Sequence, residues 1–349
     1  MNRLLVFFIV LSATFITDLT SVQGAERFAV RSMSFYWRDI SRNRTLPVKI
    51  VYPAANTEQV PPLTSDKLPV VVFSHGIGGS NQCCSYLGTA WAARGIITVH
   101  IQHPGSDENI WKGKVRILNE FKKSFARNGS GRTRAEDIRF VLDRLKQFSE
   151  EDETLGARMD LNRIGAGGID LGALAAMLVA GQVPPDSGKS LYDERVKAVV
   201  VMSPPVRHTG QTFQDAFAKV KVPALFITGT EDDGIVGPTT AAERRIPFDA
   251  MRGNDRYLVT FQGAGHRIYG GRIFSLQARN DEKFQMLIIR ASSTFLEAEL
   301  KNNAEAEQVL NGFGLRSVLG GTALVEQHTD RYAAQNIPHL PFLPIDRKE

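Results

Sequence analysis

Runs of hydrophobic residues predict a series of strands separated by helices. Residues 46–53 alternate between hydrophobic and polar positions, whereas 69–73 are continuously hydrophobic, as in a strand covered on both faces. The other predicted strands are 96–101, 164–169, 197–202, 224–228 and 257–261. Helices are predicted at 86–94, from a capping box at 133–136, after residue 170, and at 282–300 as the terminal helix. This alternation predicts an α/β fold with one mostly parallel sheet and helices on both faces.

One strand-to-helix junction carries an unusual pattern. Gly168-Ile169-Asp170-Leu171-Gly172 reads G-x-D-x-G, and the nucleophile elbow of α/β hydrolases has the same glycine spacing around a serine. The glycines allow the strand and the helix to approach closely, so the central side chain is held out above the sheet. Here that side chain is a carboxylate. The simpler interpretation is that Asp170 only caps the following helix.

A glycine-rich loop follows the first continuously hydrophobic strand. His75-Gly76-Ile77-Gly78-Gly79 resembles the loop that gives one amide to an oxyanion hole. We expect the Ile77 amide to be that donor and the amide of Leu171, directly after the elbow residue, to be the second. His75, Gly76, Gly78 and Gly79 would support the loop. A phosphate-binding loop is the alternative, but no Lys-Ser/Thr pair follows these glycines.

Two further strand ends carry an acid and a histidine. Asp232 and Asp233 follow the strand at 224–228, and His266 follows the strand at 257–261. The carboxyl ends of parallel strands meet at one edge of a sheet, where α/β proteins hold their sites. The order of elbow, acid and histidine is that of α/β hydrolases. His266 would act as general base and Asp232 would orient it, with Asp233 as the alternative acid.

The two ends of the chain differ from the middle. A basic residue, a hydrophobic run at 4–16 and small residues near 24 predict a signal peptide at 1–24. The protein would then be secreted, or held in the periplasm or cell envelope, with no stable membrane span after cleavage. We expect an α/β-hydrolase domain at 25–330 with an insertion near the site at 103–131, and an extended tail at 331–349.

Composition narrows the possible partners. The formal net charge of +5 comes from scattered basic residues, and no nucleic-acid-binding motif accompanies them. The only 2 cysteines are the neighbours Cys83 and Cys84, so no disulfide framework is expected. Two cysteines without a second pair also argue against a zinc site, and no metal site is predicted.

The chain from about residue 44 to 328 resembles the predicted dienelactone hydrolases, in the branch related to platelet-activating-factor acetylhydrolases. The resemblance rests on these segments: 46–48, 52–53, 73–80, 103–106, 137–143, 163–165, 202–204, 229–233, 244–249, 257–259 and 263–266. It implies hydrolysis of a small ester or lactone by a Ser-Asp-His triad without a cofactor. The family elbow reads G-H-S-x-G, so both Ile169 and Asp170 depart from it.

An aspartate at this position changes the chemistry. A carboxylate that attacks an ester carbonyl is itself the better leaving group, so acyl transfer through Asp170 is unfavourable. Three possibilities remain. Asp170 attacks a tetrahedral carbon, as in dehalogenases and epoxide hydrolases of this fold, with Trp91, Trp111, Tyr86 and Tyr192 as candidate leaving-group partners. Alternatively, Asp170 and His266 orient a water for attack on an ester, or the chain is an inactive homologue that binds a ligand or partner.

Overall fold

The computed structural model describes residues 28–54, 67–111, 129–184, 189–206, 212–234, 238–253, 255–270, 278–311 and 314–329. The predicted signal peptide at 1–24, the predicted tail at 331–349, and residues 112–128 of the predicted insertion lie outside these residues.

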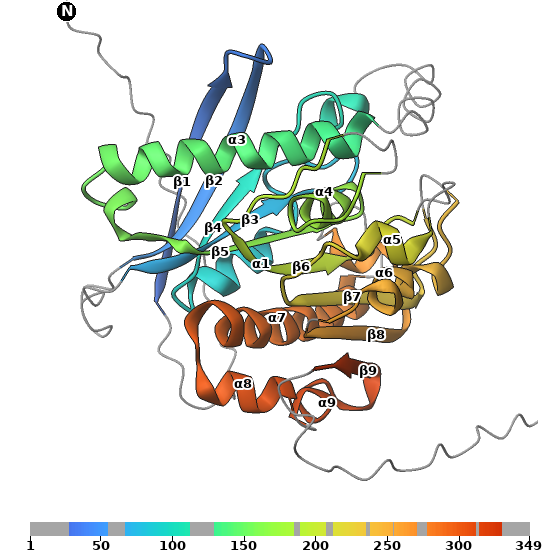
Figure 1. Cartoon of the computed structure of the whole chain (residues 1–349). Helices are drawn as coiled ribbons and strands as arrows, with labels where there is room; N and C mark the ends of the chain where they lie inside the picture. Colours follow the sequence, from blue (N-terminus) through green and yellow to red (C-terminus); the bar gives the residue numbers. More distant parts are fainter. Residues whose placement is uncertain are drawn as a thin grey trace, which may run out of the picture.

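The described strands form one mostly parallel sheet (Figure 1). Its order is β1-β2-β4-β3-β5-β6-β7-β8-β9. The neighbours β4, β3, β5, β6, β7 and β8 run parallel to one another, and the pairs β1–β2, β2–β4 and β8–β9 are antiparallel. The strands are β1 (Ala29–Asp39), β2 (Arg44–Ala54), β3 (Leu68–Ser74), β4 (Ile97–Ile101), β5 (Met159–Ile169), β6 (Val196–Met202), β7 (Ala224–Glu231), β8 (Arg256–Gly265) and β9 (Ala323–His328). The predicted α/β architecture is therefore confirmed.

Helices cover both faces of the sheet, as the continuous hydrophobic strands require (Figure 1). In β3, Val70 and Val72 pack into the core beneath α3 (Gly129–Glu151) and α4 (Leu171–Val179). Val71 and Phe73 point to the other core, beneath α1 (Ser85–Ala92) and α7 (Ala278–Lys301). The shorter helices are α5 (Phe213–Phe217), α6 (Ile246–Ala250), α8 (Ala304–Asn311) and α9 (Gly314–Leu319).

One predicted helix start and one predicted helix position are wrong. The capping box at 133–136 does not start a helix, because α3 already begins at Gly129 and these residues lie inside it. The arginine of that motif, Arg134, is buried and binds backbone carbonyls on another segment. The helix predicted at 282–300 is α7, but it is not terminal, since α8, α9 and the edge strand β9 follow it.

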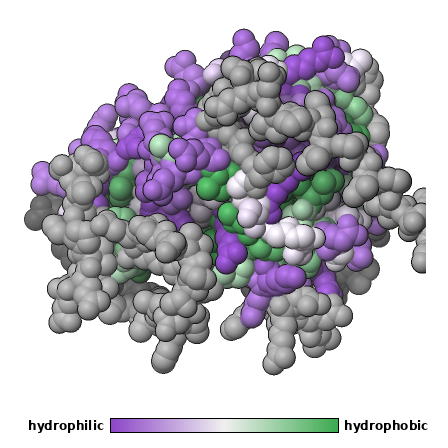
Figure 2. Space-filling view, turned by 90° about the horizontal axis from the view of Figure 1, so that it is seen from below, coloured by the Kyte–Doolittle hydropathy of each residue, from purple (hydrophilic) through white to green (hydrophobic). Residues whose placement is uncertain are grey.

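Among the coloured residues of the surface seen from below the view of Figure 1, hydrophobic residues lie toward the centre and hydrophilic residues are most abundant at the top and upper left (Figure 2). Two of the well-exposed large hydrophobic side chains, Tyr36 and Ile40, lie near the β1–β2 turn. None of the helices in the described ranges is long and hydrophobic enough to cross a membrane.

The junction of β5 and α4 depends on close backbone contact, and this generates a stability prediction. A Cβ added to Gly172 would lie 1.9 Å from the carbonyl oxygen of Ser74. We expect Gly172→Ala to lower the free energy of unfolding by at least about 1–3 kcal/mol, because β3 and α4 must separate. The control is Gly321→Ala, since nothing lies within 4 Å of a Cβ at Gly321. Equal urea midpoints for the two variants would contradict the close approach.

Candidate active site

The elbow has the strained geometry that its sequence predicts. Asp170 stands between β5 and α4 with φ 52° and ψ −119°, a conformation that non-glycine residues rarely adopt. Its amide donates to the carbonyl of Met202 at 3.0 Å, which ties the elbow to β6. Its side chain makes no capping hydrogen bond to α4, so the simpler interpretation as a helix cap is wrong. The carboxylate is instead 7% exposed and directed toward the glycine-rich loop.

The glycine-rich loop presents a backbone amide to this carboxylate. The Ile77 N–H donates to Asp170 Oδ2 at 3.2 Å. Gly78 has a φ of +65°, and a Cβ there would meet the indole of Trp111 at 2.1 Å, so the loop requires glycine at this position. Its amide and carbonyl are bound by Ser106 O and Trp111 Nε1, respectively. The amide predicted to be an oxyanion-hole donor is therefore directed at the elbow residue.

Asp232 and His266 form a hydrogen-bonded pair at the ends of β7 and β8. His266 Nδ1 lies 2.9 Å from Asp232 Oδ1. The fully buried Asp232 also accepts hydrogen bonds from Thr228 Oγ1 at 3.0 Å and Tyr269 OH at 3.3 Å. An ionised carboxylate only accepts, so Nδ1 carries the proton and Nε2 keeps its lone pair. Asp233 instead accepts from the amide of Ala241, so Asp232 is the acid that contacts His266.

Ser203 is a member of this site that was not predicted. Its hydroxyl lies 2.9 Å from Asp232 Oδ1 and 2.8 Å from His266 Nδ1. It directly follows β6 with a positive φ of 49°, and its amide donates to Ile227 O on β7. The segment 202–204 was part of the family resemblance, but nothing in its local pattern indicates that the serine contacts both the acid and the histidine.

The fully buried Arg244 holds these two segments together. Its Nε donates to Asp232 O at 3.0 Å, and its Nη1 donates to Ser203 O at 2.9 Å and Pro204 O at 3.0 Å. Its Nη2 lies 3.8 Å from Asp232 Oδ1, so a positive charge is close to the buried acid. This cation offsets the cost of burying the Asp232 carboxylate and fixes the backbone that carries it.

Neighbouring strands bring the two halves of the site to one edge of the sheet. The strands β5, β6, β7 and β8 are consecutive in the sheet. The amide of Asp170 is hydrogen-bonded to Met202 at the end of β6. Ser203, which follows Met202, contacts His266. Both Asp170 and His266 lie within the described residues, and no hydrogen bond or ion pair joins them there. Leu171 starts α4 next to Asp170, as expected.

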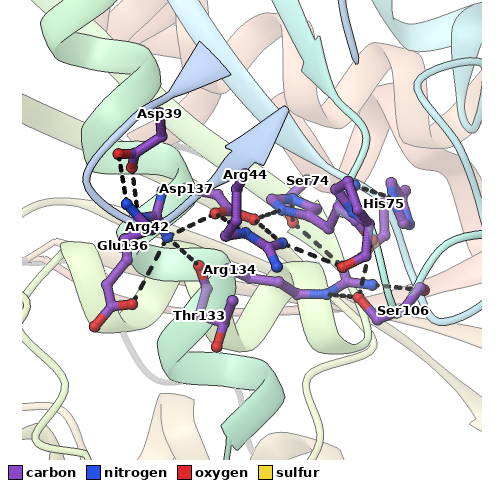
Figure 3. A network of polar contacts seen from close by, with 12 residues as sticks. Asp39, Arg42, Arg44, Ser74, His75, Ser106, Thr133, Arg134, Glu136 and Asp137 are labelled. Carbon is purple, nitrogen blue, oxygen red and sulfur yellow. Dashed lines mark hydrogen bonds and ion pairs between the residues drawn. The ribbon is translucent and has the colours of Figure 1, made fainter. Parts of the chain in front are cut away.

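A buried polar network lies behind the glycine-rich loop (Figure 3). Ser74 Oγ lies 2.8 Å from His103 Nε2, and His103 Nδ1 lies 2.9 Å from Asp137 Oδ2. Asp137 also binds Arg42 Nη1 at 2.7 Å and Arg44 Nη2 at 2.9 Å. Ser74, His103 and Asp137 are hydrogen-bonded in the same sequence as the members of a catalytic triad. All three are fully buried, so they support the loop and do not face substrate.

The side chain of His75 also faces this network. Its Nδ1 donates to Gly76 O at 2.5 Å, and its Nε2 accepts from the His103 amide at 3.1 Å. Burial, with the nearby charge of Arg134, lowers the pKa of His75 well below its usual value. A neutral, fully bonded imidazole suits the supporting role predicted for this residue.

Two of the four candidate leaving-group partners already make hydrogen bonds through their indole N–H. Trp91 Nε1 donates to Ser292 Oγ, and Trp111 Nε1 donates to Gly78 O. Tyr192 is 46% exposed, and the Tyr86 hydroxyl is buried without a hydrogen-bond partner within the described ranges. The described residues contain no group of three or more His, Cys, Asp or Glu side chains that could hold a metal ion.

One comparison with known proteins matches the first part of the chain. Residues 33–148 match the family model of platelet-activating factor acetylhydrolase, isoform II, which belongs to the α/β-hydrolase superfamily. The chain has the α/β-hydrolase fold. The matched segment runs from β1 to α3 and includes the 75–79 loop, but it ends before Asp170. No curated protein matches the chain.

The buried His103 generates a prediction for the pH dependence of stability. Burial lowers the pKa of His103 to about 4, whereas an unfolded histidine titrates near 6.5. Between these values the unfolded chain binds more protons, so stability present above about pH 6.5 is lost as the pH falls toward 4. We expect this residue to contribute about 1–3 kcal/mol of that loss in urea unfolding.

The control is His103→Gln, which removes the titrating group. Its free energy of unfolding should be lower at neutral pH, because Asp137 loses a partner, but should change less between pH 6.5 and 4. A variant with the pH dependence of the wild type would rule out this contribution of His103.

Proposed function

We propose that this protein is a hydrolase of small molecules that uses Asp170, Asp232 and His266. The observation that carries the proposal is the 2.9 Å contact between Asp232 and His266 at the sheet edge that also holds Asp170. Because Asp232 binds the Nδ1 proton, the Nε2 lone pair can take a proton from water. The match to an acetylhydrolase family supports an esterase-like hydrolase.

The contact between Ile77 and Asp170 favours a carboxylate nucleophile. Oδ2 of Asp170 accepts the hydrogen bond from the Ile77 amide, which an ester carbonyl would need for its own oxygen. The other oxygen, Oδ1, is left to attack a tetrahedral carbon that bears a leaving group. The bond from Oδ1 to carbon forms as the bond to the leaving group breaks, giving an alkyl ester of Asp170. A haloalkane or an epoxide is the matching class of substrate.

The second step would use His266. Nε2 takes a proton from water as the water oxygen attacks Cγ of the Asp170 ester. The negative charge then develops on Oδ2, where the Ile77 amide is in place and the Leu171 amide is adjacent. Collapse releases the alcohol, which takes the proton from His266. The second proton of the water stays on the Asp170 carboxyl and then passes to solvent, which restores the carboxylate and balances the halide released, or the epoxide oxygen protonated, after the first step.

A second candidate is the hydrolysis of an ester or lactone by water without a covalent intermediate. The family match over residues 33–148 and the resemblance to dienelactone hydrolases favour this substrate class. Asp170 and His266 would orient the water. The Ile77 amide would donate its hydrogen bond to the substrate carbonyl in place of Asp170. We further propose from residues 1–24 that the protein acts outside the cytoplasm, as a secreted or envelope protein.

We expect His266→Ala to reduce turnover by about 10²–10⁴-fold, because both reactions need a base for water. Initial rates would be measured on nitrophenyl butyrate, butyrolactone, bromobutane and styrene oxide. The control is His328→Ala, which removes a histidine from the edge strand β9. Equal rates for wild type and His266→Ala would remove His266 from the mechanism. An inert wild type would support the inactive, ligand-binding alternative.

A further inference from the structure

Arg134 is a fully buried cation that lies directly behind the glycine-rich loop (Figure 3). It extends from α3, and its guanidinium donates to the carbonyl oxygens of His75, Gly76 and Ser106. Its Nε also donates to Ser106 Oγ at 3.0 Å. One rigid fork of donors therefore binds both the loop at 75–79 and the bend at Ser106.

These contacts determine which way the loop amides face. In a trans peptide the carbonyl and the following N–H point in opposite directions. Because Arg134 binds the carbonyls of His75 and Gly76, the amides of Gly76 and Ile77 are turned away from it. The Ile77 amide then meets Asp170 Oδ2 at 3.2 Å. The arginine lies on one side of the loop and the carboxylate on the other.

The charge of Arg134 also acts across the loop. Among the described residues, none of its nitrogens forms an ion pair with a carboxylate, and its hydrogen-bond partners are neutral oxygens. Burial lowers the pKa of Arg134 to about 10, and the negative charges of Asp170 and Asp137 oppose that shift. Arg134 thus remains charged at neutral pH and favours negative charge at the elbow.

We infer that Arg134 is a positioning residue that orients the Ile77 amide, the expected oxyanion-hole donor of the glycine-rich loop, by binding the carbonyls behind it. The Ile77 amide oriented in this way would stabilise the negative charge that develops on the oxygen it binds during the reaction. The effect on turnover rests on the proposed hydrolase function, whereas the orientation of the amides does not. The two parts are therefore measured separately.

The orientation is tested by hydrogen exchange of the Ile77 amide, followed by NMR. We compare wild type, Arg134→Ala and Arg134→Lys, which keeps a positive charge but cannot bind the same set of oxygens. We expect Ile77 exchange to accelerate by about tenfold or more in both variants, while core amides of β5 keep their protection. The control is Arg139→Ala on the same helix, whose side chain is 44% exposed and lies near Asp193.

Unchanged Ile77 exchange in a folded Arg134→Lys protein would overturn the inference, even if Arg134→Ala fails to fold. Turnover provides the second measurement. We expect Arg134→Lys to lower kcat by about 10²-fold with a smaller change in KM, as for loss of an oxyanion donor. Added guanidinium should partly restore kcat to Arg134→Ala, whereas methylammonium at equal ionic strength should not.

Full kcat in Arg134→Lys would also overturn the inference. If the wild type hydrolyses nothing but Ile77 exchange accelerates in Arg134→Lys, the positioning role stands and the proposed function fails. These outcomes therefore distinguish an incorrect role for Arg134 from an incorrect assignment of the activity.

Discussion

The hydrogen bond from the Ile77 amide to Asp170 Oδ2 is the interaction on which the site depends. It exists because β5 turns into α4 against the end of β3, with only glycine tolerated at the point of contact. A serine at the elbow would leave this amide free for a substrate oxygen. A carboxylate occupies it with its own oxygen. In the proposed mechanism the amide therefore stabilises an intermediate whose carbonyl belongs to Asp170.

Two buried arginines maintain the two halves of this arrangement. Arg134 binds the carbonyls behind the glycine-rich loop, and Arg244 binds the backbone of Asp232, Ser203 and Pro204. In each case a cation is surrounded by carbonyl oxygens that loops would otherwise leave unpaired. The strained φ values of Asp170 and Ser203 lie in the segments that these contacts and the neighbouring strands restrain.

The local patterns of the chain predicted the elbow, the central strands and the order of Asp170, Asp232 and His266. These features depend on residues that are close in sequence or on the order of strands in a parallel sheet. Arg134, Arg244 and Ser203 were not predicted as site residues, because their partners lie on segments far apart in the chain. The capping-box pattern at 133–136 predicted the wrong start for α3 and gave no role to Arg134, since short motifs do not indicate which side chains the tertiary fold buries.

The most direct test of the account is the fate of the oxygen atom in a single turnover. Protein in molar excess over bromobutane or styrene oxide would react in water enriched in the heavy oxygen isotope. The mass of the peptide that contains Asp170 would then be measured by mass spectrometry. A carboxylate nucleophile predicts that heavy oxygen enters Asp170 while the first product carries unlabelled oxygen. Heavy oxygen found only in the product, with Asp170 unchanged, would contradict the account.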